Sequence, residues 1–319
     1  MIFLCGIPSE PSLGLVIDAI RELGAPHVVF HQRRFADSSM EFRINGGRLT
    51  GSISFGHDVY RLEDFTAVYT RLMDCRLLPE VENEPADSPV RFHCTSLHDA
   101  IMRWYELMPG LVLNRSAEVG SNYSKPYECQ LIRECGFAVP ETLITNDPDE
   151  VKAFRRQYGT IIYKSISYIR SIVRTLDDDD LARLDDIRAC PTQFQRFIPG
   201  TNVRVHTVGD QAIATAITAS TTDYRYAYLE GEEEVLEPTE LPGDYADRCV
   251  ELSRALRLGF AGIDLKITPD GDVYCLEVNP CPAFSYFQLR AGQPIAQAVA
   301  AYLAAAGSSN NHNSKGARL

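Results

Sequence analysis

The feature that most constrains the fold of this chain is the segment 262–279, which reads as two β-strands joined by a tight turn. Asp270 and Gly271 occupy the turn, and such a pair favours a two-residue hairpin loop when strand-forming residues flank it. Ile, Leu, Val and Tyr residues lie on both sides. The chain is therefore expected to contain antiparallel sheet, and the loop fixes which residues of the two strands face each other.

This register predicts a pair of carboxylates on one face of the hairpin. If Asp270 and Gly271 alone form the loop, Asp264 faces Glu277. Directly opposed side chains have Cβ atoms about 4.5–5.5 Å apart, where two carboxylates repel. Asn279 follows two residues after Glu277 and points to the same face. Three hard oxygen donors suit Mg²⁺, so we predict that Asp264, Glu277 and Asn279 are metal ligands.

The carboxylate pair has an ordinary alternative explanation. Lys266 lies on the same face and is placed to neutralise Glu277 in a surface ion pair. We favour the metal because the ion pair leaves Asp264 and Asn279 unexplained. The prediction depends on the loop length, since a three-residue loop would destroy the register.

Composition excludes several classes of function. The 319 residues suggest two or three domains. Lys and Arg number 31 against 43 Asp and Glu, and the formal charge of -12 has the wrong sign for a nucleic-acid partner. No apolar run approaches the roughly 20 residues of a membrane helix, so we expect no membrane partner. The nine cysteines form no C-x-x-C pair, and the N-terminus has no signal-peptide pattern. We expect a cytoplasmic protein.

The order of patterns along the chain predicts mixed α/β and α+β architecture. Strand-like residues 2–4, a helical pattern over 13–23 and strand-like residues 28–30 form an α/β unit at the start. A hairpin is expected near Gly46 and Gly47. The last helix is expected to end near Ala306, and the Ser/Asn-rich tail 307–319 to be disordered.

A second candidate site surrounds Lys164, which ends an apolar strand. The turn 165–171 that follows carries several hydroxyls and one cation. A lysine charge beside backbone N–H groups and hydroxyls suits a phosphate. Without other support, an ordinary exposed hairpin explains these residues better.

Taken together, these motifs resemble the ATP-grasp superfamily, specifically RimK-like carboxylate-amine ligases, and among them most closely graspetide synthetases, which cross-link ribosomal peptides. The resemblance covers about residues 110–300. The residues that carry it are Asn114, Ser124-Lys125-Pro126, Gly136-Phe137-Ala138-Val139-Pro140-Glu141-Thr142, Ile162-Tyr163-Lys164-Ser165, Gln195-Arg196-Phe197-Ile198, Asn202-Val203-Arg204-Val205, Asp223-Tyr224-Arg225-Tyr226, Gly262-Ile263-Asp264 and Glu277-Val278-Asn279-Pro280.

The resemblance implies an ATP-grasp fold with three parts and a tail. An N-terminal α/β domain would span 1–113, a central lid subdomain 114–190, and a C-terminal antiparallel-sheet subdomain 191–306. ATP would lie between the last two, with Mg²⁺ on its phosphates. Residues implied to bind the nucleotide are Lys125, Lys164, Ser165, Ser167, Arg170, Gln195, Arg196, Phe197, Ile198 and Asn202.

The resemblance also implies catalytic roles. Lys164 would contact the phosphates of ATP. Arg204 and Arg225 would contact the transferred phosphoryl group or the substrate carboxylate, since planar guanidinium groups match both. For each arginine the alternative is a surface ion pair, and for Arg225 this rival is serious. Asn202 stands where the family commonly has Asp. The phosphate loop of the family is usually glycine-rich, whereas 165–171 has no glycine, so its detailed contacts are left open.

The implied activity is ADP-forming ligation. A carboxylate would be activated as an acyl phosphate and joined to an amine or hydroxyl on a ribosomal precursor peptide. One alternative joins small carboxylate and amine substrates, and another, of a different class, is a non-catalytic ATP-binding module. The sequence leaves open a homodimer.

Overall fold

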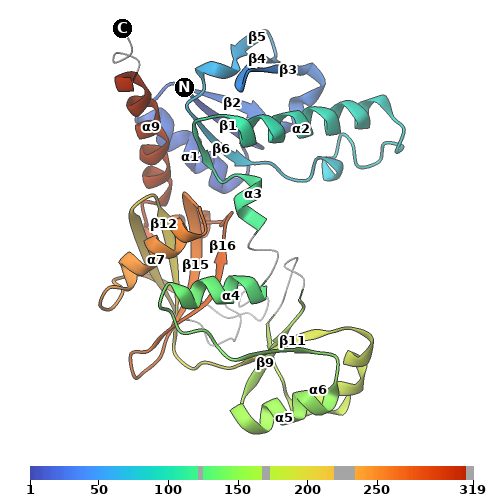
Figure 1. Cartoon of the computed structure of the whole chain (residues 1–319), viewed down its shortest axis with the longest axis vertical. Coiled ribbons are helices and arrows are strands. Elements are labelled where there is room, and N and C mark those ends of the chain that lie inside the picture. The colour runs from blue at the N-terminus through green and yellow to red at the C-terminus, as the bar shows by residue number, and fades with distance from the viewer. Residues whose placement is uncertain (121–124, 167–172, 219–233, 314–319) are drawn as a thin grey trace.

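The computed structural model describes residues 1–120, 125–166, 173–218 and 234–313. Its strands form four sheets. Along the long axis of Figure 1, the two sheets of β1–β6 lie at the top, the sheet with β12, β15 and β16 in the middle, and the sheet with β9 and β11 at the bottom. The sheet orders are β2-β1-β6-β7, β3-β4-β5, β10-β9-β11-β8 and β14-β13-β12-β15-β16. The mixed α/β and α+β class expected from the sequence is confirmed.

The first sheet is parallel and is covered on both faces. Its inner strands are β1 (Ile2–Gly6) and β6 (Ala67–Arg71), and its outer strands are β2 (His27–His31) and β7 (Leu111–Leu113). Side chains alternate along β1, so that Ile2 and Leu4 belong to one core, and Phe3 and Cys5 belong to another. Helices α1 (Pro11–Glu22) and α9 (Ile295–Asn313) cover the first face, and α2 (Pro89–Leu107) covers the second.

A three-stranded antiparallel sheet extends from this domain. It consists of β3 (Ser38–Asn45), β4 (Arg48–Phe55) and β5 (Asp58–Arg61). The hairpin expected near Gly46 and Gly47 is confirmed, and both glycines have the positive φ (54° and 80°) that a two-residue turn between twisted strands needs.

The central sheet is small and antiparallel. Its strands are β8 (Thr142–Thr145), β9 (Ile161–Lys164), β10 (Arg174–Thr175) and β11 (Thr192–Arg196). Helices α5 (Pro148–Tyr158) and α6 (Asp178–Ala182) lie on one side of it (Figure 1). A core that includes Val151 and Phe194 joins the helices to the sheet. The opposite face is turned toward the last sheet.

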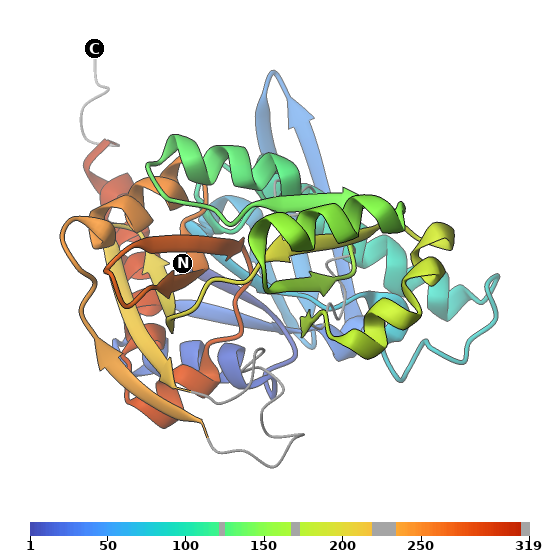
Figure 2. The same ribbon diagram turned by 90° about the horizontal axis from the view of Figure 1, so that it is seen from below.

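The last sheet has five antiparallel strands. They are β12 (Thr201–Val208), β13 (Gln211–Thr218), β14 (Val235–Thr239), β15 (Phe260–Ile267) and β16 (Val273–Asn279). Helices α4 (Lys125–Glu134), α7 (Tyr245–Ala255) and α8 (Ser285–Ala291) pack against it, whereas α3 (Ser116–Val119) contacts α2 of the first domain. Short 3-10 turns elsewhere in the chain lie at Gln32–Asp37, Leu62–Asp64, Cys75–Leu77 and Leu184–Ala189. Figure 2 shows the linker from β11 to β12 running between the two sheets.

The hairpin of β15 and β16 pairs Asp264 with Glu277, as predicted, but the loop has a different length. Val273 faces Ile267, and the N–H of Thr268 donates to the carbonyl of Asp272 at 2.9 Å. The loop therefore holds three residues, with Gly271 in the left-handed region at φ 90°.

A β-bulge restores the register that the longer loop shifts. Asp264 pairs with Glu277, whereas Leu265 pairs with Cys275, so Leu276 has no opposing residue. The extra loop residue and the extra strand residue cancel. The pairing of Asp264 with Glu277 was thus predicted correctly, although the two-residue loop on which the prediction was based is wrong.

The C-terminal helix is longer than the sequence indicated. Helix α9 continues to Asn313 rather than ending near Ala306, so the expectation of disorder over 307–319 is wrong for 307–313. The alanine-rich stretch before Ala306 is strongly helix-forming, and an existing helix extends more easily than a new one begins. Residues 314–319 lie outside the described part of the chain. Within the described part, no helix is long and apolar enough to cross a bilayer.

Candidate active site

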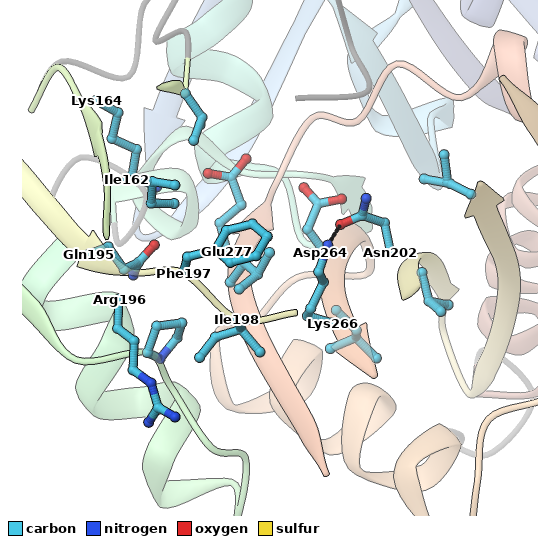
Figure 3. Close-up of a pocket in the computed structure, with 16 residues that line it drawn as sticks. Ile162, Lys164, Gln195, Arg196, Phe197, Ile198, Asn202, Asp264, Lys266 and Glu277 are labelled. Atoms are coloured by element: carbon cyan, nitrogen blue, oxygen red, sulfur yellow. Dashed lines mark hydrogen bonds between the residues drawn. The ribbon is translucent and has the colours of Figure 1, made fainter. Parts of the chain in front are cut away.

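A cavity lies between the central sheet and the last sheet, at the linker between β11 and β12 (Figure 3). It brings together residues that are distant in the sequence. Predicted site residues among those that line it are Lys164, Gln195, Arg196, Phe197, Ile198, Asn202, Asp264 and Glu277. Ile162, Val203, Ile217, Leu265 and Leu276 add apolar surface. A pocket with an apolar lining and a few polar groups suits a nucleotide.

The acidic pair enters the cavity from β15 and β16. The bulge at Leu276 lets Leu276 and Glu277, although consecutive, both line the cavity, while Cys275 and Val278 on either side are buried in the core. Asp264 faces Glu277 across the hairpin. Without the bulge the alternation of a strand would turn Glu277 away from Asp264.

Arg204 on β12 is the ion-pair partner of Asp264. Its Nη1 donates to Oδ2 of Asp264 at 2.7 Å, and the arginine is only 5% exposed. The guanidinium lies across Gly262, where a Cβ would sit 2.3 Å from Nη2. A glycine is therefore required at this position for Arg204 to reach Asp264. Arg204 thus makes an ion pair, as the alternative expected, but the pair is buried and not on the surface. Asp264 lines the cavity and Arg204 lies behind it, outside the residues that line the cavity.

Asn279 lies at the end of β16, opposite Gly262. Its Oδ1 accepts a hydrogen bond from the N–H of Cys281 at 2.9 Å, which orients the side-chain amide. A carbonyl oxygen has two lone pairs, so this bond is compatible with an additional cation contact.

The donor set fits Mg²⁺ better than a metal held by protein alone. Within the described residues, no three His, Cys, Asp or Glu side chains gather into a metal site. Two facing carboxylates and one amide oxygen, all hard donors, match an ion that keeps waters and substrate phosphates in its shell. Asp264, Glu277 and Asn279 would hold the ion here.

Lys266 is directed to Asn202. Its Nζ donates to Oδ1 of Asn202 at 3.0 Å and lies 5.9 Å from the ring centre of Phe197 (Figure 3). Burial lowers the pKa of Lys266. The ammonium group therefore occupies the side of the cavity formed by Asn202 and Phe197, not the predicted alternative position beside Glu277.

The side chains of Gln195 and Arg196, at the end of β11, bind to other residues of the protein. Gln195 Nε2 donates to Oγ1 of Thr142 at 3.0 Å, and Arg196 is 3.4 Å from the carboxylate of Glu141. Residues 195–198 nevertheless line the cavity. This arrangement favours recognition of a base by backbone groups, as expected from the resemblance.

Lys164 reaches the cavity from the end of β9. Across the sheet it pairs with Gln193 of β11. Ser165 is exposed just beyond the strand. Ser167, Arg170, Arg225 and the side chain of Lys125 lie outside the described residues, so their predicted roles stay predictions.

Two buried polar residues hold β15 and β16 in place and were given no role from the sequence. Asn114 donates to the carbonyl groups of Phe260 and Pro280, both at 2.6 Å, and accepts from the N–H of Gly259 at 2.9 Å. Glu128 on α4 is 2% exposed and accepts from the N–H of Val278 at 2.6 Å. Glu128 falls among Leu131 and Ile132 on the inner side of a helix, and a charged residue there was a usable signal.

Arg71 joins the first domain to the segment after β16. It makes an ion pair with Glu10 at 2.8 Å and donates to the carbonyl of Pro282 at 3.1 Å. Neither contact follows from sequence spacing, because the partners are far apart along the chain. The N-terminal domain therefore fixes the end of β16, the strand that carries the predicted metal ligands Glu277 and Asn279.

Comparison with known proteins agrees with this geometry. Residues 124–303 match the RimK-like ATP-grasp domain family. The chain is similar to the ATP-grasp ligase PsnB complexed with minimal precursor, with TM-score 0.77 and 27% identity, covering 96% of this chain and 98% of PsnB. It is also similar to the macrocyclase MdnC of Microcystis aeruginosa MRC bound with precursor peptide MdnA, with TM-score 0.76 and 26% identity, covering 95% and 99%.

A curated protein extends the comparison to sequence. The chain is 22% identical over 228 residues to a probable alpha-L-glutamate ligase of Shewanella loihica, covering 68% of this chain and 75% of that protein. The family match spans more than half of the chain, and the resemblance inferred from the motifs is confirmed. This chain therefore belongs to the RimK-like ATP-grasp family and is an ATP-dependent ligase that uses Mg²⁺.

Proposed function

We propose that this ligase activates side-chain carboxylates of a ribosomal precursor peptide and joins them to amine or hydroxyl groups of the same peptide. The observation that carries the proposal is the pair Asp264 and Glu277 in the same cavity as Lys164. Similar solved structures were bound to precursor peptides, which supports a peptide substrate.

The reaction proceeds in two displacements. A substrate carboxylate oxygen attacks the γ-phosphorus, and the bond to the β-phosphate oxygen breaks, giving ADP and an acyl phosphate. The amine or hydroxyl then attacks the acyl carbon and releases inorganic phosphate, with its proton passing to solvent or a nearby base. Bound Mg²⁺ supplies charge neutralisation at the phosphates. Catalysis rests mainly on positioning and electrostatics.

Each proposed residue has a physical task. Lys164 and Lys125 balance phosphate charge, together with Ser165, Ser167 and Arg170 of the following loop. The backbone of 195–198 and the side chain of Asn202 hold the nucleoside. Arg204 orients Asp264 through their 2.7 Å ion pair, and Arg225 takes the substrate carboxylate. The central part, 114–190, closes over the acyl phosphate and excludes water.

We place the acceptor nucleophile in a separate cavity of about 260 Å³ beside the end of β16. This cavity is lined by Arg71 at the end of β6, by His98 of α2 and by Pro280 and Cys281, which directly follow Asn279. Ligands of open α/β sheets bind at the carboxyl ends of the strands.

A second candidate is ligation of small carboxylate and amine substrates. The similarity to a probable alpha-L-glutamate ligase favours it. The test is an intact-mass assay with Mg·ATP and the peptide encoded beside this gene. Loss of one water per bond with matching ADP release supports the peptide ligase. ADP release with glutamate and an amine, and no change of peptide mass, supports the second candidate. Absence of both would count against both substrate classes.

A further inference from the structure

A second, larger cavity of about 910 Å³ adjoins the nucleotide cavity and has no part in the chemistry described above. It lies between α4 and the central sheet, and Pro140 lines both cavities. Phe137 and Val139 supply apolar surface, and Tyr274 of β16 closes one side. The cavity is thus a groove that leads toward the nucleotide.

One wall of this groove is the open edge of a sheet. Strand β8 is the last strand in the order β10-β9-β11-β8. The N–H of Arg196 donates to the carbonyl of Glu141 at 2.9 Å, and hydrogen-bonded positions alternate along an antiparallel pair. The backbone N–H and C=O groups of Thr142 and Ile144 therefore point away from β11. In the described part of the chain no other strand pairs with this edge.

A buried amide lies beside the open edge. Gln193 is the cross-strand partner of Ile144, and both side chains line the groove. Gln193 is 3% exposed, and its Oε1 has no hydrogen-bond partner among the described residues. A buried polar atom without a partner is costly, so the groove favours an occupant that supplies a hydrogen bond.

The charges of the groove favour an acidic occupant. Its charged lining residues are Arg133 of α4 and Glu141. Glu141 already makes an ion pair with Arg196 at 3.4 Å. The local balance is therefore positive on a chain whose formal charge is -12, and an acidic segment is attracted here while the rest of the surface repels it.

We propose that an extended, acidic segment of the peptide substrate docks in this groove by adding as a strand to the open edge of β8. Main-chain hydrogen bonds to Thr142 and Ile144 supply affinity, Gln193 pairs with a peptide group, and Arg133 selects carboxylate side chains. Four residues in this conformation span about 13 Å. The proposal rests on the proposed function, which makes a peptide with activatable carboxylates the substrate.

The test separates the backbone contact from the side chains. Ile144→Pro removes the outward N–H without removing a bond to β11, and proline is tolerated in edge strands. Ile144→Val is the matched control that keeps this N–H. The probe is the peptide encoded beside this gene, titrated with Mg²⁺ and a non-hydrolysable ATP analogue. Loss of one hydrogen bond predicts roughly three- to tenfold weaker binding for Ile144→Pro, with little change for Ile144→Val. Nucleotide affinity should be unchanged in both.

Two further variants examine the side chains. Gln193→Leu keeps the size of the buried side chain and removes its amide, and Arg133→Glu reverses the charge. Both should raise the Kd for the peptide, and the effect of Arg133→Glu should shrink at high salt.

Hydrogen exchange gives an independent answer that does not depend on how well a variant folds. The amides of Thr142 and Ile144 in the wild-type chain should become protected when the peptide is added. Unchanged exchange at saturating peptide, no peptide binding, or protection that depends on protein concentration alone, as in pairing of two copies, would each overturn the proposal. Protection of β8 without any change in peptide mass would retain the groove and count against the proposed function.

Discussion

The two walls of the nucleotide cavity are built differently. The wall from the last sheet is held by contacts inside the protein, with Arg204 bound to Asp264 and Lys266 bound to Asn202. The wall from the central sheet presents Lys164 at the end of a four-residue strand, beyond which the chain leaves the described residues. We infer that the wall from the last sheet is preorganised by these contacts, whereas the wall from the central sheet supplies the charge of Lys164 from the end of a short strand.

The largest effect is expected on the preorganised wall, from inserting one alanine between Leu276 and Glu277. With Leu276 still the bulge residue, the inserted alanine lies opposite Asp264, Glu277 moves to the opposite face and the carboxylate pair is lost. Acceptor-dependent ADP formation should then disappear. An added glycine after Gly271 is the matched control, because it lengthens an exposed loop and leaves the bulge in place. Equal Mg²⁺ dependence in the two variants would contradict this explanation.

Alanine substitutions compare the walls directly. Glu277→Ala and Lys164→Ala should each lower acceptor-dependent ADP formation by roughly two orders of magnitude or more, since each removes a charge that balances the phosphates. Added Mg²⁺ should partly restore only Glu277→Ala. Controls are the exposed Asp272→Ala for the first wall and Lys152→Ala, on α5, for the second. Full activity of either site variant removes that residue from the site.

Gly262→Ala measures how closely the first wall is packed. The added Cβ would lie 2.3 Å from Arg204 Nη2, so the arginine must move away from Asp264. Overpacking of this kind costs about 1–3 kcal/mol. A lower Tm and reduced kcat are expected. Gly120→Ala, where no atom lies within 4 Å of the added Cβ, should change neither.

The smallest effect concerns Lys266. Its pKa is lowered by burial, so the unfolded chain binds more protons in the alkaline window below the usual value of 10.5. Folding stability contributed by this group therefore rises as pH increases through that window. The gain is less than about 1 kcal/mol, because partial exposure screens the charge. Urea unfolding should detect this slope in the wild type and not in Lys266→Met.

Local sequence patterns predicted more of the fold than of the candidate site. The hairpin at Gly46 and Gly47, the strand-helix-strand start and the pairing of Asp264 with Glu277 all follow from short-range rules of turns and alternation. The bulge at Leu276 does not, because no turn residue or glycine marks it. Missing the bulge did not change the predicted pair, because the predicted loop was also one residue too short and the two shifts of register cancel.

Contacts between distant segments escaped sequence reasoning. Arg71 meets Pro282, and Glu128 meets Val278, only after the sheets have assembled. Burial of Arg204 was also unpredictable, because a charge on an alternating strand looks the same whether it faces water or a cavity. Gly262 explains that burial once the structure is known, since a glycine in a strand often marks a close approach.

The helix α9 has a consequence for how the molecule is made. Leu303 and Val299, near the carboxyl end, share a core with Ile2, Leu13 and Ile17 at the amino end. During synthesis, the residues near the carboxyl end leave the ribosome only after almost the whole chain that follows Ile17 has been made. Until α9 has been synthesised, this face of the parallel sheet is therefore covered by α1 alone, and its apolar surface is only partly buried.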